Sequence, residues 1–208
     1  MICYIFGASE ITDYEYYREK INKDSYIICA DGGIRHLEKL GISPDVIIGD
    51  FDSSNEPESD NKVVYPSEKD DTDLGLAIAY AQEKGFKKCV AIGCLGGRLD
   101  HTIASIHLLK YAYDKGIKLE LIDKNTKVML ITEETKIKND GYKYISVFPF
   151  GDKAESVTLC GLKYPLFEKT LYAGFPLGVS NEFKDGEAVI KTVQPLVVIL
   201  IREDEKND

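Results

Sequence analysis

The chain has few of the features expected of membrane, secreted or nucleic-acid-binding proteins. No uninterrupted apolar run among its 208 residues is longer than six, as in Leu196–Ile201, whereas a membrane span needs roughly 20. No basic segment precedes the short apolar stretch at the N-terminus, so we expect no signal peptide and a cytoplasmic location. Its 35 acidic residues outnumber the 26 basic ones, which argues against unaided binding to nucleic acid. We therefore expect neither nucleic acid nor a membrane as a partner.

Cysteine is too scarce and too irregularly spaced to build a disulfide framework. The five cysteines are an odd number and include no C-x-x-C pair, so we predict buried, reduced thiols without a catalytic role. They form no zinc-ligand spacing with the three histidines. We expect His101 and His107, which are six residues apart, to pack or to cap a helix. The third histidine is His36, and the five cysteines are Cys3, Cys29, Cys89, Cys94 and Cys160.

Several common nucleotide and hydrolase motifs are also missing. The chain has no G-x-x-x-x-G-K-[ST] phosphate loop, no G-x-G-x-x-G after its first apolar run and no G-x-S-x-G turn. These absences exclude a Walker-type NTPase and disfavour a dinucleotide dehydrogenase.

Negative charge, by contrast, is concentrated in one segment. The segment from Asp45 to Asp73 carries −8 of the net charge of −9. It contains ten carboxylates, and its only basic residues are Lys62 and Lys69. Carboxylate oxygens are the ligands that hard divalent cations prefer. The segment therefore predicts a site for a divalent metal ion.

The two halves of the chain differ in periodicity. The first half alternates short apolar runs with amphipathic helical patterns, and several runs are apolar on both faces, which predicts an open, mainly parallel α/β sheet over residues 1–124. After about Asn125 short β-branched and aromatic runs predict an all-β, sandwich-like domain over residues 125–208. Helices are expected around 74–81 and 103–113. The apolar runs are Ile2–Phe6, Tyr26–Ala30, Val46–Ile48, Val63–Tyr65, Cys89–Ile92 and Ile117–Ile122, then Lys127–Ile131, Tyr142–Phe148, Ser156–Cys160, Glu187–Val193 and Leu196–Ile201.

Polar side chains follow the predicted strands of the first half, where open α/β sheets bind ligands. Asp31-Gly32-Gly33 follows one strand, and Gly49-Asp50-Phe51-Asp52 follows the next. Because alternate residues of an extended chain point the same way, Asp50 and Asp52 are suited to grip one Mg²⁺. The alternative is an Asx turn in which each carboxylate bonds nearby amides.

Two further segments precede the predicted helices. Asp70 and Asp73 are three residues apart, so they are either metal-site carboxylates or a helix cap in which Asp70 is the N-cap and Asp73 reaches back. Gly96-Gly97-Arg98 lets backbone amides converge on an anion while the guanidinium clamps phosphate oxygens. Alternatively the glycines make a turn, Arg98 pairs with Asp100 or a neighbour, and Asp100 is an N-cap. Together the acidic segment and this arginine suggest phosphoryl transfer.

In this order, the motifs resemble those of the thiamin pyrophosphokinase family. The resemblance is carried by Ala30–Gly33, Pro44–Ser53, Asp70–Asp73, Gly96–His101, Gly161–Leu166 and Gly178–Phe183. It implies transfer of pyrophosphate from ATP to the hydroxyl of thiamin, which gives thiamin diphosphate and AMP. It also implies an α/β catalytic domain, a thiamin-binding β-sandwich and a homodimer with the vitamin between subunits.

The resemblance assigns a role to each motif residue. Asp50, Asp52 and Asp73 would hold Mg²⁺, Asp100 would orient or deprotonate the thiamin hydroxyl, and Arg98 would hold the polyphosphate. Thiamin itself would contact Ser180, Asn181, Tyr164 and Asp100. Asp73, Arg98 and Asp100 are thus the predicted catalytic residues. The predicted ATP site comprises Asp31, Gly32, Gly33, Lys69, Asp70, Thr72, Gly96, Gly97 and Arg98.

The chain departs from the family pattern at three positions. Tyr164 stands where animal members carry Trp, and Arg35 stands where some relatives carry Asn. Leu76 stands where some relatives carry Lys, so we expect Lys69 to replace that phosphate contact. Two other functions remain open. One is a Mg²⁺-dependent nucleotide pyrophosphohydrolase, and the other is a non-catalytic sensor of thiamin or nucleotide.

Overall fold

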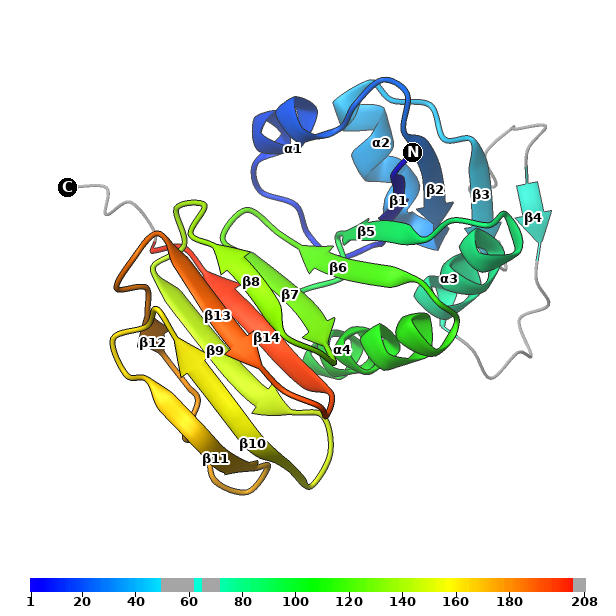
Figure 1. Ribbon diagram of the computed structural model, residues 1–208. Coiled ribbons are helices and arrows are strands. Elements are labelled where there is room, and N and C mark those ends of the chain that lie inside the picture. The colour runs from blue at the N-terminus through cyan, green and yellow to red at the C-terminus, as the bar shows by residue number, and fades with distance from the viewer. Residues whose placement is uncertain (50–61, 65–71, 204–208) are drawn as a thin grey trace. The chain divides into compact units, whose positions relative to one another are not determined.

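The structure is a computed structural model that describes residues 1–49, 62–64 and 72–203. The chain divides into two compact units, Met1–Lys124 and Asn125–Asp208, which we call the N-terminal and C-terminal units. Figure 1 labels their helices and strands. Within the described ranges, no helix is both long and apolar enough to cross a membrane.

The N-terminal unit is built on parallel strands. They follow one another in space in the order β6-β5-β1-β2-β3-β4, and each neighbouring pair is parallel. The strands are β1 (Cys3–Phe6), β2 (Tyr26–Ala30), β3 (Val46–Gly49), β4 (Lys62–Val64), β5 (Lys88–Ile92) and β6 (Lys118–Ile122). The helices are α1 (Tyr14–Lys20), α2 (Ile34–Leu40), α3 (Asp73–Glu83) and α4 (Leu99–Asp114), with a short 3₁₀ turn η1 (Asp31–Gly33) before α2.

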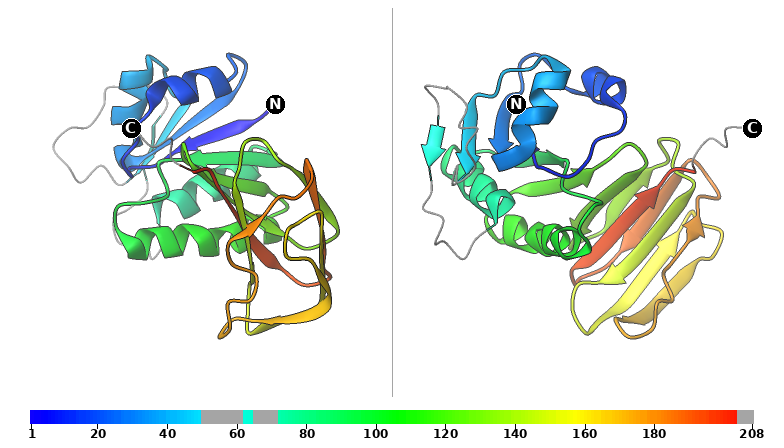
Figure 2. Two further views of the ribbon diagram at one scale, coloured as in Figure 1. Left: turned by 90° about the vertical axis from the view of Figure 1, so that its left-hand side faces the viewer. Right: turned by 180° about the vertical axis from the view of Figure 1, so that it is seen from behind.

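Helices cover both faces of this sheet, which explains why its strands are apolar on both sides. Tyr4 and Phe6 of β1 belong to one buried cluster with Tyr17 of α1 and Leu37 of α2. The opposite face packs against α3, whose Ala77, Ile78 and Ala81 are fully buried. Figures 1 and 2 show α1 and α2 on one face, and α3 and α4 on the other.

The strand order reverses direction at β1. From β1 the chain adds β2, β3 and β4 on one side, and it then crosses back to place β5 and β6 on the other side. Ligands of open α/β sheets bind at such a reversal, outside the carboxyl ends of the strands. The ends of β1 and β5 are therefore where a ligand site is expected.

The C-terminal unit consists of antiparallel strands around one apolar core. One set follows the order β12-β9-β14-β7, and the other follows the order β11-β10-β13-β8. Side chains of both sets, among them Val147, Leu159 and Val198, form a single buried cluster. The strands are β7 (Thr126–Ile131), β8 (Thr135–Lys138), β9 (Tyr144–Pro149), β10 (Lys153–Cys160), β11 (Leu166–Tyr172), β12 (Asn181–Glu182), β13 (Glu187–Lys191) and β14 (Leu196–Ile201).

The predicted fold class, an α/β domain followed by a β-rich domain, is confirmed. As predicted, none of the five cysteines, all of which lie in the described residues, forms a disulfide. Their predicted burial is correct for Cys3, Cys29, Cys89 and Cys94, whereas Cys160 is only half-buried.

Gly33 holds the start of α2 against β1, and this contact gives a first testable prediction. A Cβ at this position would collide with the carbonyl oxygen of Phe6, a backbone atom that cannot rotate away. We expect Gly33→Ala to lower the free energy of unfolding by about 1–3 kcal/mol, the usual cost of overpacking. Gly151→Ala is the matched control because a Cβ there meets nothing within 4 Å. Urea unfolding of both variants measures the difference, and equal midpoints would contradict the prediction.

Candidate active site

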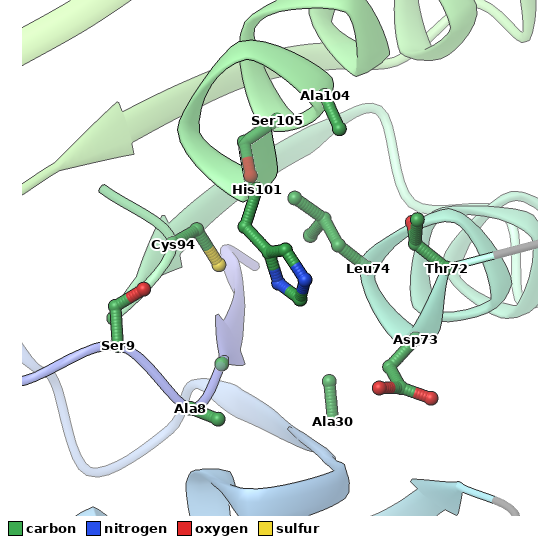
Figure 3. A pocket seen from close by; sticks show the side chains of 12 residues that line it. Ala8, Ser9, Ala30, Thr72, Asp73, Leu74, Cys94, His101, Ala104 and Ser105 are labelled. Atoms are coloured by element: carbon green, nitrogen blue, oxygen red, sulfur yellow. The ribbon is translucent and has the colours of Figure 1, made fainter. Parts of the chain in front are cut away.

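A cavity of about 350 Å³ opens at the strand-order reversal of the N-terminal unit. Its walls come from four parts of this unit that are distant in sequence (Figure 3). They are the loop after β1, the end of β2, the start of α3, and the loop after β5 with the first turns of α4. The lining residues are Gly7, Ala8, Ser9, Ala30, Thr72, Asp73, Leu74, Gly93, Cys94, His101, Ala104 and Ser105.

Backbone groups hold the two central loops together. The amide of Gly7 donates to the carbonyl of Ile92 at 2.8 Å, and the amide of Ser9 donates to the carbonyl of Gly93 at 2.8 Å. A Cβ at Gly7 would lie 2.6 Å from the Gly93 oxygen, so glycine is required for this close approach. These backbone hydrogen bonds and the close approach at Gly7 therefore hold the loop after β1 against the loop after β5 at the cavity wall.

The loop after β1 is also supported from behind by a buried histidine. His36 is 3% exposed, and its Nδ1 lies 2.9 Å from the Tyr14 hydroxyl. Burial, followed by the nearby Arg35 charge, lowers the pKa of His36, although hydrogen bonding to the backbone of Ser9 and Ala8 acts in the opposite direction. Arg35 donates to the carbonyl of Ala8. These contacts fix the position of the cavity wall at Ala8 and Ser9.

The start of α3 brings one predicted metal ligand to the cavity. Thr72 is the N-cap, and its Oγ1 accepts a hydrogen bond from the Gly75 amide at 3.2 Å. Asp73 is the first residue of the helix and lines the cavity. The alternative in which Asp70 caps this helix is therefore wrong, because Thr72 occupies the cap position. Asp73 follows this cap and lines the cavity wall.

The glycine loop before α4 adopts the backbone that the sequence predicts, but its arginine is already paired. Gly96 and Gly97 have φ values of +80° and +66°, which favour glycine. Arg98 Nε and a terminal guanidinium nitrogen donate to the two Asp100 carboxylate oxygens at 3.2 and 2.6 Å. Both side chains are exposed, and neither lines the cavity. The predicted alternative of an Arg98–Asp100 pair is thus correct for this structure.

Asp100 is a poor proton acceptor in this arrangement. Hydrogen bonding from Arg98, helped by the His101 amide at 3.0 Å, lowers the pKa of Asp100 to about 2. The carboxylate therefore stays ionised throughout the neutral pH range. Asp100 is the second residue of α4 and Arg98 is its N-cap, so the suggestion that Asp100 caps the helix is wrong.

Part of the predicted site falls outside the structure's coverage. Asp50, Asp52, Lys69 and Asp70 lie outside the described residues. Asp31, Gly32 and Gly33 form η1, and a Cβ at Gly32 would lie 3.0 Å from the Ala8 Cβ, so this turn abuts the cavity loop. Over residues 1–49, 62–64 and 72–203, no three His, Cys, Asp or Glu side chains gather as a metal site.

His101 is the main functional candidate that sequence reasoning missed. It was expected to pack or cap, yet it is exposed and its ring projects into the cavity (Figure 3). Cys94 also lines the cavity, where burial raises the pKa of its thiol to about 12. Gly7–Ser9 follows the first predicted strand, so the strand-end rule applied to Asp31 and Asp50 could have identified this loop as well.

The C-terminal unit has a smaller cavity of its own, of about 220 Å³. Its lining is apolar apart from the Tyr164 hydroxyl and the Asn181 amide, and Tyr164 is 59% exposed. Such a hollow suits one flat aromatic ring. Its lining residues are Leu159, Tyr164, Leu166, Leu177, Val179 and Asn181.

Asn181 and Ser180, both predicted thiamin contacts, differ in their surroundings. The Asn181 side chain is buried and clamps the backbone of Tyr164: its Oδ1 accepts from the Tyr164 amide at 2.9 Å, and its Nδ2 donates to the Tyr164 carbonyl at 2.7 Å. Ser180 is exposed and has a φ of +55°, a strained conformation of the kind that collects at ligand sites. Its amide donates to the Ser146 hydroxyl at 3.0 Å.

Comparison with known proteins identifies the family. Residues 17–121 match the thiamin pyrophosphokinase catalytic domain, and residues 134–197 match the thiamin pyrophosphokinase vitamin B1 binding domain. The chain is 33% identical over 186 residues to thiamine pyrophosphokinase of Bacillus subtilis, and the match covers 85% of this chain and 87% of the relative. It is 27% identical over 191 residues to thiamin pyrophosphokinase 1 of Caenorhabditis elegans, and this match covers 85% of this chain and 79% of the relative.

Solved structures agree with this match. The crystal structure of thiamine pyrophosphokinase from Bacillus subtilis superposes with a TM-score of 0.87 at 31% identity, covering 98% of this chain and 100% of that one. The thiamin pyrophosphokinase of Geobacillus thermodenitrificans gives 0.85 at 27% identity, with 99% of each chain covered. The chain therefore belongs to the thiamin pyrophosphokinase family.

Proposed function

We propose that the activity of the family, ATP-dependent synthesis of thiamin diphosphate, takes place at the cavity of the N-terminal unit. In this reaction the hydroxyl of thiamin receives pyrophosphate from ATP, and AMP leaves. The observation that carries the proposal is the Asp73 carboxylate on the wall of a cavity at the strand-order reversal. Phosphoryl transfer depends chiefly on positioning and charge neutralisation, and such a site offers both.

We propose Mg²⁺ as the metal and Asp50, Asp52 and Asp73 as its ligands. The donor chemistry fits: Asp73 offers oxygen, and the only cysteine among the described lining residues is held as a neutral thiol by burial. When bound, Mg²⁺ would neutralise charge on the triphosphate.

ATP is the co-substrate, and the proposed contacts surround the cavity. Asp31, Gly32 and Gly33 are proposed contacts on the η1 turn, of which Gly32 approaches Ala8 of the cavity loop. Gly96 and Gly97 precede α4 with amides suited to an anion. Arg98 would bind phosphate with the guanidinium edge that Asp100 leaves unused. Lys69, Asp70 and Thr72 complete the proposed ATP site.

Thiamin is proposed to contact Tyr164, Ser180 and Asn181 of the C-terminal unit, and Asp100 of the N-terminal unit. The exposed Tyr164 ring would stack on the aminopyrimidine. Because Asn181 already serves the Tyr164 backbone, its contribution to binding is chiefly to hold that ring. The thiazolium is cationic, which suits the acidic charge of the chain.

We further propose a cytoplasmic homodimer whose thiamin site involves both subunits, an open α/β catalytic domain and a β-sandwich. Large apolar side chains exposed on the C-terminal unit support the dimer, since such surface commonly marks an interface. They include Phe167 at 67%, Phe175 at 65% and Tyr172 at 55% exposure. Sedimentation at two protein concentrations tests the dimer, and a monomer at both would contradict it.

One assay tests the function. We expect the protein, incubated with ATP, Mg²⁺ and thiamin, to form AMP and thiamin diphosphate in equal amounts. AMP formed without thiamin would instead indicate a pyrophosphohydrolase. Binding of thiamin or nucleotide without AMP would indicate a sensor.

A further inference from the structure

His101 combines a position on the cavity wall with a ring that is available to a ligand. The residue lies in the first turn of α4, and Figure 3 shows its imidazole directed into the open part of the cavity. Within the described residues no side chain hydrogen-bonds this ring. The neighbouring walls are small and mostly apolar, with Ala8, Ala30 and Ala104 among them. His101 is thus the one nitrogen base among the described lining residues.

Asp73, one of the proposed metal ligands, lines the same cavity as His101. The Asp73 carboxylate and the His101 ring belong to the same cavity, on α3 and α4 respectively. If the metal bound at Asp73 holds the triphosphate, as proposed above, the attacking hydroxyl must enter this cavity. His101 then lines the same cavity that the reacting atoms occupy.

Asp100 is less suited to receive a proton. It lies outside the cavity lining, is 63% exposed and is occupied by Arg98. Its depressed pKa, about 2, makes proton transfer to it unfavourable at neutral pH. Imidazole is the side-chain base that titrates closest to neutrality, and bases of that kind are the most efficient general bases at physiological pH.

We propose that His101 is the proton acceptor for the thiamin hydroxyl, an inference that rests on the proposed function. The hydroxyl oxygen forms a bond to the β-phosphorus of ATP. The bond from that phosphorus to the oxygen bridging to the α-phosphorus breaks, and its electron pair leaves with AMP. The hydroxyl proton passes to a ring nitrogen of His101. Asp100 then acts as a positioning residue through Arg98 rather than as the base.

Ionisable groups from the neighbouring elements surround the His101 ring and influence its ability to accept a proton. From α3 the Asp73 carboxylate lines the cavity, and from the loop after β5 the Cys94 thiol does so. The thiol remains neutral at physiological pH because burial raises its pKa to about 12. On α4 itself the neighbouring charge is Asp100, which Arg98 pairs. The loop after β1 contributes the Ser9 hydroxyl, which does not titrate in the working range.

The test is the pH dependence of kcat in three proteins: wild type, His101→Gln and His107→Gln. His107 is the matched control because it is exposed on the same helix and does not line the cavity. We expect wild-type kcat to fall as the pH is lowered, since a protonated imidazole cannot accept a proton. His101→Gln should lower kcat about 100-fold, and its kcat should no longer fall at low pH. His107→Gln should keep the wild-type kcat and the wild-type fall at low pH.

A second variant separates catalysis from structure. His101→Ala should regain part of its kcat when imidazole is added to the buffer, with an unchanged melting temperature. Unchanged kcat in His101→Gln would overturn the inference, and so would a lowered kcat that keeps the wild-type fall at low pH and gains nothing from imidazole. A wild-type protein that makes no thiamin diphosphate would overturn the proposed function itself, which is a different outcome.

Discussion

Asp73→Asn is expected to lower kcat by about two decades or more while the protein stays folded. The substitution keeps the size of the side chain but removes its charge, so a cation at the cavity wall loses a carboxylate ligand. Removing one group that stabilises developing charge typically costs 10²- to 10³-fold in kcat. Asp73 is the first residue of α3 and lines the cavity, so its charge is directed at the ligand space.

The cost in stability should be small. A carboxylate in the first turn of a helix is favoured by the helix dipole by about 0.3–1 kcal/mol, and relief of repulsion from neighbouring acidic residues works in the other direction. We therefore expect the melting temperature without metal to change by a few degrees at most. Mg²⁺ should raise the melting temperature of the wild type and have a weaker effect on the variant.

Glu83→Gln is the matched control for Asp73→Asn. It makes the same change of charge on the same helix, at the last residue of α3 and away from the cavity lining. Steady-state kcat and a Mg²⁺ titration of the melting temperature measure both variants. Near-normal turnover in Asp73→Asn, or an equal loss in Glu83→Gln, would remove Asp73 from the proposed site.

Much of the fold could be predicted from the sequence because buried strands and amphipathic helices have strong periodic patterns. Tyr26–Ala30 and Leu196–Ile201 were predicted with their observed bounds, since both are uninterrupted apolar runs. β8 and β11 were not predicted. At least half of the residues in Thr135–Lys138 and in Leu166–Tyr172 are exposed, and the lysines and threonines of these strands give weak apolar alternation. Helix α1, at seven residues, is too short to show a clear period.

The candidate site was only partly accessible to sequence reasoning. Strand ends and motif order led to Asp73, because both depend on local sequence. The role of His101 depends on the direction of one ring and on walls from four distant segments, which periodicity does not encode. The Arg98–Asp100 pair was predicted as one of two alternatives, and only the three-dimensional structure distinguishes them. Asn181 was likewise predicted as a ligand contact, whereas its hydrogen bonds serve the backbone.

Asn181→Ala is expected to destabilise the C-terminal unit and to weaken thiamin binding together. The side chain is 5% exposed and satisfies three backbone groups: the Tyr164 amide at 2.9 Å, the Tyr164 carbonyl at 2.7 Å and the Glu182 amide at 3.0 Å. A partly buried group left without its partner typically costs about 1–3 kcal/mol, so we expect a total loss of about 3 kcal/mol. Urea unfolding measures this loss.

The same substitution should raise the KM for thiamin while leaving the KM for ATP nearly unchanged. Without the clamp the segment that carries the Tyr164 ring is free to move, and ordering it again costs binding energy. Asn139→Ala is the matched control because Asn139 is exposed in the same unit.

Asn181→Asp should have an intermediate effect, since it keeps the acceptor for the Tyr164 amide but turns a carboxylate toward the Tyr164 carbonyl. A stable Asn181→Ala protein with normal thiamin KM would show that the clamp does not position Tyr164, and an equal rise in the KM for ATP would point to general loss of structure instead.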